Sequence, residues 1–132
     1  MSEAEAAARI ETIERGYEYL LAYAAQGRQD DRGTELRATL TAMHAAMTGL
    51  GDVLASGFAA LPASSGIADY LAAVRRDVAV ARGAVGLVLT RAHIPSLLVD
   101  NLNASVHLRA LLTDLFLLEQ AGRGEALQEE ME

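Results

Sequence analysis

The sequence contains no cysteine, no lysine and no tryptophan. Without cysteine there can be no disulfide scaffold, no thiolate metal site and no cysteine nucleophile. All eleven basic residues are arginine, so Schiff-base chemistry and lysine-assisted phosphate binding are excluded as well. Aromatic residues make up only 5% of the chain, so a core has to be built from small aliphatic side chains.

Proline is also scarce, with two residues in 132, which leaves room for long helices. No apolar run approaches the ~20 residues that a membrane-spanning helix needs. The first residues lack the basic and apolar regions of a secretory signal. We therefore expect a cytoplasmic bacterial protein without a membrane partner.

Hydrophobic residues amount to 52% and charged residues to 22%, which is enough apolar material for one globular domain. The formal net charge is -7, and this acidity argues against nucleic acid as a partner. The sequence therefore predicts a folded domain whose partners are not polyanions.

Turn-forming residues divide the chain into four long segments and a tail. The segments cover residues 2–27, 34–62, 67–93 and 96–121. Residues 1–121 are expected to form the domain, and the acidic residues 122–132 are expected to form a disordered tail. The glycines of Thr48–Asp52 allow either a kink or a break in the second segment.

Apolar residues in each segment recur at alternating steps of three and four, as on one face of a helix. The predicted core positions include Ile10, Ile13, Tyr17 and Leu20; Leu36, Leu40, Met43 and Met47; Val74, Val78, Ala81 and Val85; and Leu97, Asn101, Leu108 and Leu111. Helices of similar length joined by short loops run antiparallel to their neighbours. The sequence therefore predicts an all-α fold, an up-down-up-down antiparallel four-helix bundle.

The fourth segment is apolar around most of its circumference, more than one four-helix chain can bury. Only a narrow polar strip is expected to face water: Asp100, Asn103, His107 and Asp114. The first segment adds two tyrosines four residues apart, a residue type enriched in interfaces. We therefore expect a homodimer packed through the first and fourth helices. Its expected interface residues are Tyr19, Tyr23, Val99, Leu102, Val106 and Leu117.

Asn101 lies on the predicted core stripe, where a polar side chain needs partners. It either fixes helix register or lines a small-molecule pocket with Tyr17 and Arg109. Arg109 has apolar neighbours on its helix and is expected to pair with a carboxylate, within the chain or across the dimer.

No Glu-x-x-His pair of a di-iron site and no haem-attachment motif is present, so neither a metal nor a cofactor is expected. His44 is similar to the phosphotransfer histidine of histidine-phosphotransfer domains, which carry His-x-x-Lys-Gly. Here Met47 stands at the basic position and Gly49 arrives one place late. The Arg37-x6-His44 spacing resembles that of HEPN-type helical ribonucleases, in which arginine and histidine act on the scissile phosphate.

These observations predict a protein that is not an enzyme and that acts through protein–protein contacts, as an adaptor, chaperone-like subunit or sensor module. It is expected to be a homodimer with a possible further protein partner. The alternatives are a small-molecule binder using Tyr17, Asn101 and Arg109, and an enzyme using His44 and Arg37.

Overall fold

The computed structural model describes residues 3–58 and 61–131, with the side chains of 4–58, 61–62 and 64–121. This part of the chain has six α-helices, one short 3-10 helix and no strand, so the all-α prediction is confirmed. The elements are α1 Glu3–Ala24, α2 Leu36–Met47, α3 Leu50–Gly57, η1 Ala63–Ser65, α4 Ile67–Leu89, α5 Ser96–Ala104 and α6 His107–Met131.

The second predicted helix is divided into α2 and α3, so the glycine-rich segment is a break rather than a kink. Thr48 is extended, and Gly49 has a φ of 73°. Glycine adopts this left-handed conformation without the steric cost that a β-carbon brings.

The fourth predicted helix is also divided, into α5 and α6, which the sequence did not indicate. Ser105 ends α5, and Val106 has a φ of 60° before α6 begins. Among the described residues Val106 is the one non-glycine with a positive φ. Neither glycine nor proline marks this point, and for that reason the sequence predicted an uninterrupted helix.

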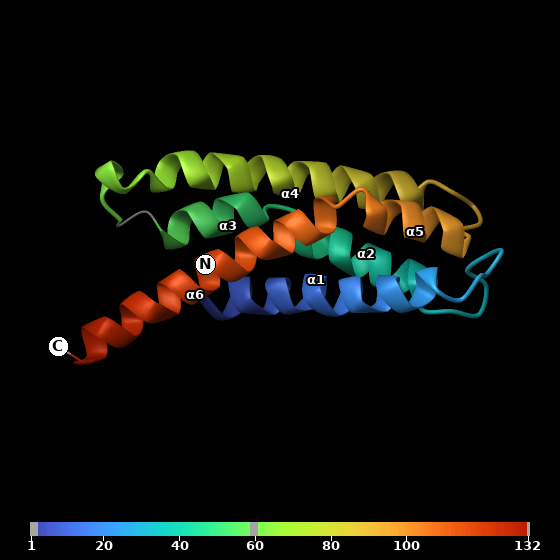
Figure 1. Ribbon diagram of the computed structural model, residues 1–132, viewed down its shortest axis with the longest axis horizontal. Helices are drawn as coiled ribbons and strands as arrows, with labels where there is room; N and C mark the ends of the chain where they lie inside the picture. Colours follow the sequence, from blue (N-terminus) through green and yellow to red (C-terminus); the bar gives the residue numbers. More distant parts are fainter. Residues whose placement is uncertain (1–2, 59–60, 132) are drawn as a thin grey trace.

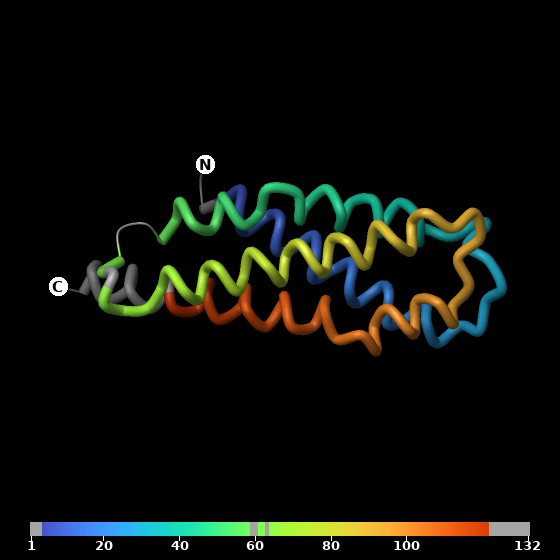
Figure 2. The backbone as a smooth tube through the Cα atoms, turned by 90° about the horizontal axis from the view of Figure 1, so that it is seen from above, coloured from blue at the N-terminus to red at the C-terminus, as the bar shows by residue number. Residues whose placement is uncertain are grey.

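α1 and α4 run along the long axis of the molecule, whereas α6 runs obliquely to it (Figures 1 and 2). α1 packs against α2, α3, α5 and α6, and α4 packs against the same four helices. α1 and α4 make no contact with each other, so they occupy opposite corners of the molecule. The broken pairs α2/α3 and α5/α6 fill the space between them.

The core is aliphatic, as the composition predicted. Most positions of the predicted stripes of the first three segments and of α6 are buried, including Ile13, Leu40, Val85 and Leu111, whereas Tyr17 is half-buried. The prediction fails on α5, where Leu97 is 68% exposed and Asn101 is also exposed. Val99 and Leu102 face the core instead, because the break at Val106 gives α5 a helical phase different from that of α6.

The expected acidic tail, 122–132, lies outside the residues whose side chains are described, although α6 itself extends to Met131. Its disorder therefore stays a prediction. Within the described residues, none of the helices combines the length and apolar character needed to span a bilayer.

Two helical glycines have opposite surroundings. A β-carbon at Gly16 would overlap the buried side chain of Met43, whereas one at Gly83 would meet nothing within 4 Å. We expect Gly16→Ala to lower the free energy of unfolding by about 1–3 kcal/mol through overpacking. The matched control Gly83→Ala should raise it by up to about 1 kcal/mol through helix propensity. Urea unfolding followed by circular dichroism measures both, and equal effects would contradict the close α1–α2 packing.

Candidate functional site

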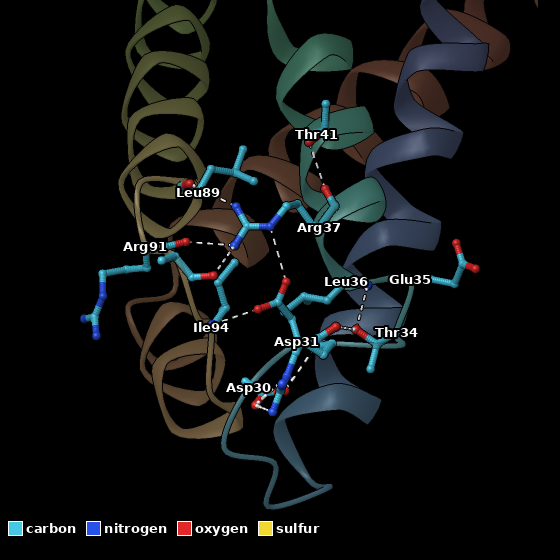
Figure 3. Close-up of polar contacts among 12 residues, drawn as sticks. Asp30, Asp31, Thr34, Glu35, Leu36, Arg37, Thr41, Leu89, Arg91 and Ile94 are labelled. Carbon is cyan, nitrogen blue, oxygen red and sulfur yellow. Dashed lines mark hydrogen bonds and ion pairs between the residues drawn. The ribbon is translucent and has the colours of Figure 1, made fainter.

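The densest polar cluster joins the α1–α2 loop to the α4–α5 loop at one end of the molecule (Figure 3). Arg37 of α2 donates from Nε to Asp31 Oδ2 at 3.2 Å and from Nη1 to the Leu89 carbonyl at 3.2 Å. Its Nη2 donates to the carbonyls of Arg91 at 2.7 Å and Ala92 at 3.3 Å. Leu89 is the last residue of α4, and Arg91 and Ala92 follow it, so the guanidinium caps the C-terminal end of that helix.

A second set of hydrogen bonds joins the same two loops. The Tyr23 hydroxyl donates to the Ile94 carbonyl at 2.6 Å, and the Ser96 hydroxyl donates to the Tyr23 carbonyl at 2.7 Å. Ser96 Oγ also accepts from the Arg28 amide at 2.9 Å, and the Ser96 amide donates to the Arg28 carbonyl at 2.9 Å. The buried serine therefore links the loops instead of capping α5.

Electrostatics keep this cluster in one protonation state at neutral pH. Burial raises the pKa of Asp31, but hydrogen bonds from the Ile94 amide and from Arg37 outweigh it, and the pKa is lowered overall. Burial raises the pKa of Tyr23, and the charge on Asp31 raises it further. Asp31 therefore remains an acceptor and Tyr23 a donor, as a structural lock requires.

The expected catalytic pair is not assembled. Arg37 uses its donors on Asp31 and backbone carbonyls, and no hydrogen bond connects it to His44 in the described residues. His44 is half-buried, with Nε2 3.5 Å from where a β-carbon on Gly86 would lie. In this structure the Arg37 guanidinium therefore stabilises the contact between α2 and the two loops.

We expect Arg37→Met to lower the free energy of unfolding by about 1–3 kcal/mol, because several carbonyls and the Asp31 carboxylate lose a charged donor. The control Arg91→Met alters an exposed side chain for which the structure gives no hydrogen bond, and it should change stability by less than about 0.5 kcal/mol. Denaturant titration of the two variants tests this. Equal losses would contradict the capping role of Arg37.

The expected ligand residues Tyr17, Asn101 and Arg109 do not form a pocket. Tyr17 is half-buried against the core, whereas Asn101 and Arg109 are exposed. The groove beside Arg109 has a volume of about 360 Å³ and includes neither of the other two residues. Its lining is Val106, Arg109, Ala110, Thr113 and Asp114.

Arg109 also has no ion-pair partner in the described part of the chain, so the carboxylate that the sequence predicted for it is not found within this protomer. The partly buried amide on α5 is Asn103, which the sequence had assigned to the water-facing strip. Its Nδ2 donates to the Leu20 carbonyl at 3.3 Å, while its Oδ1 is buried without a partner.

Asp114 was likewise expected to face water but lies between α6 and α4, where it meets Asp77. Its buried Oδ2 accepts no hydrogen bond from an amide, hydroxyl or guanidinium group of the described residues. The Tyr70 hydroxyl donates instead to the backbone carbonyl of Asp114 at 3.2 Å. Burial, the hydrogen bond with Asp77 and the charge of Asp77 together raise the pKa of Asp114 to about 7. A protonated Asp114 can donate to Asp77, whereas two carboxylates would repel each other.

This pair predicts a pH dependence of stability. The pKa of Asp114 is raised from 3.8 to about 7 in the folded state. Its contribution to the free energy of unfolding is therefore fully present below pH 3.8 and is lost as the pH rises to about 7. We expect Asp114→Asn to flatten the decline of unfolding free energy over this interval. The control Asp100→Asn, on an exposed residue of α5, should leave it unchanged. An identical decline in all three proteins would rule out the pair as its source.

Of the six expected interface residues, the structure places three in the core of the chain itself: Tyr23, Val99 and Leu102. Tyr19 is half-buried, stacks on Tyr23 with ring centroids 6.4 Å apart, and accepts a hydrogen bond from the Glu35 amide. These side chains complete the protomer and leave little area for a partner.

The other two expected interface residues are exposed, Val106 at 48% and Leu117 at 56%. Leu21 at 48% and Phe116 at 40% are exposed as well. These four residues belong to the neighbouring helices α1 and α6 and the junction before α6, and we call them the α1/α6 face.

No group of three metal-binding side chains occurs among the described residues. Comparison of the chain with protein-family models, with curated proteins and with solved structures gave no match.

Proposed function

We propose that this chain is a non-catalytic helical-bundle protein that acts through protein–protein contacts, as an adaptor, chaperone-like subunit or sensor module. It self-associates as a two-fold dimer through the α1/α6 face. The observation that carries the proposal is the exposure of four large apolar side chains on adjoining elements: Leu21, Val106, Phe116 and Leu117. Grouped exposed apolar side chains are typical of interaction surfaces.

Charged residues of α1 and α6 that lack ion pairs support a second copy as the occupant. Arg109 of α6 and Glu14 and Glu18 of α1 are without ion pairs in the part of the chain that the structure describes. In a two-fold dimer the surface of one protomer meets the identical surface of its partner. Arg109 of each protomer can then approach the α1 carboxylates of the other, which favours a defined orientation.

The backbone at Val106 gives a third argument. A left-handed conformation costs an L-residue about 1–2 kcal/mol that glycine does not incur. Gly49 occupies the equivalent conformation at the α2–α3 break, yet here the chain has a valine that is 48% exposed. Burial within the protomer does not offset the strain, whereas burial against a second copy would.

The proposal includes three expectations from the sequence. In architecture, α2/α3 and α5/α6 each count as one interrupted helix, so the domain corresponds to an up-down-up-down four-helix bundle. We also propose that the protein is cytoplasmic and that its source is bacterial.

Sedimentation velocity of the full chain tests the dimer. We expect the wild-type protein to sediment as a dimer and Leu21→Glu/Leu117→Glu to sediment as a folded monomer, because two charges per protomer would be buried in the interface. The matched control is Leu87→Glu on α4, which changes an even more exposed leucine and should leave the dimer intact.

Val106→Gly sharpens the test, because it should weaken the dimer while maintaining or increasing protomer stability through relief of backbone strain. A wild-type monomer at all concentrations would overturn the proposal. A dimer unaffected by the α1/α6 substitutions would overturn the assignment of its interface.

A further inference from the structure

The outward side of α4 is basic in an otherwise acidic chain of net charge -7. Arg75, Arg76 and Arg82 are all exposed there. Arg75 pairs with Asp52 of α3 at 2.8 Å, but Arg76 and Arg82 have no ion pair within the described residues. The exposed carboxylate of this helix, Asp69, lies two turns before Arg76, near the helix start. Two guanidinium groups are therefore available to a partner.

Exposed apolar side chains are interleaved with these charges. Val80 is 42% exposed and Leu87 is 71% exposed. Arg76, Val80, Gly83 and Leu87 follow one another at steps of four, three and four, so they form one stripe along the helix. This spacing is typical of a seam that packs against another helix.

Gly83 lies in the middle of this stripe. It is exposed, and a β-carbon there would meet nothing within 4 Å, so packing inside the protomer does not explain a glycine. A glycine inside a helix is destabilising relative to alanine. A small residue in a helical seam allows a second helix to approach closely, which accounts for its position.

A shallow groove runs beside the stripe, between α4 and the start of α3. It has a volume of about 210 Å³ and is bordered by Arg75, Ala79 and Arg82 on α4 and by Gly49, Gly51 and Asp52, the partner of Arg75, on the other side. Arg75 and Arg82 therefore flank a shallow depression beside the stripe.

We propose that the outward side of α4 is a docking surface for an acidic amphipathic helix of another protein. The partner's aliphatic side chains cover Val80 and Leu87, and its carboxylates pair with Arg76 and Arg82. Charge complementarity favours carboxylates, and the apolar seam favours a helix over a phosphate backbone. The surface contains none of the four residues of the α1/α6 face, so the proposal does not depend on the dimer.

Fluorescence anisotropy of the full-length protein with a synthetic helix tests the proposal. The probe is a labelled peptide of about 20 residues, long enough for substantial helicity in water. It has leucines at heptad spacing and glutamates beside them. We expect saturable binding at low salt, weakened at least about tenfold by Arg76→Glu/Arg82→Glu. The control Arg15→Glu makes the same type of charge change on an exposed residue of α1, which does not contact α4, and this variant should bind the peptide like wild type.

A second variant leaves the arginines unchanged and prevents a partner helix from approaching α4 closely. Gly83→Leu has open space for its side chain and should fold with an unchanged or higher melting temperature while binding the peptide more weakly. Absence of saturable binding, or equal binding of the same peptide with lysine in place of glutamate, would overturn the proposal. A change in sedimentation mass on Arg76→Glu/Arg82→Glu would also overturn it, because the surface would then join copies of this chain.

Discussion

The guanidinium group of Arg37 holds together the end of the molecule where two loops meet. It joins the Asp31 carboxylate to the carbonyls that follow α4, and the Tyr23–Ser96 hydrogen bonds connect the same loops a few residues away. With both loops fixed, the directions of α1, α2, α4 and α5 are fixed relative to one another. The packing of the remaining helices follows from that frame, since α3 and α6 continue from α2 and α5.

Much of the fold could be predicted because burial in helices leaves a periodic record in the sequence. The stripes through Ile13, Leu40, Val85 and Leu111 identified the core faces correctly. The break at Val106 could not be predicted, because its left-handed backbone is occupied by a residue that normally avoids it. Extending one helical phase across that break made Asn101 a core residue and placed Asn103 in water, and both assignments were wrong.

The candidate sites were less predictable because they depend on contacts between helices. The spacing of Arg37 and His44 along one helix suggested a catalytic pair. It does not reveal that the Arg37 guanidinium donates hydrogen bonds to carbonyls at the end of α4. The Asp77–Asp114 pair has no local signal beyond two isolated aspartates on different segments. Exposed apolar surface was anticipated from the apolar circumference of the last segment, and Val106 and Leu117 carry it.

The two breaks also have a consequence for changes in chain length. Inside a continuous helix, one inserted or deleted residue rotates everything beyond it by about 100° and exchanges core for surface. At Thr48-Gly49 and at Val106 the backbone leaves right-handed helical geometry, so an added or lost residue there can be absorbed by non-helical torsion angles. These two junctions are therefore where the long helical sides of the molecule can tolerate a change of length over evolutionary time without altering the core.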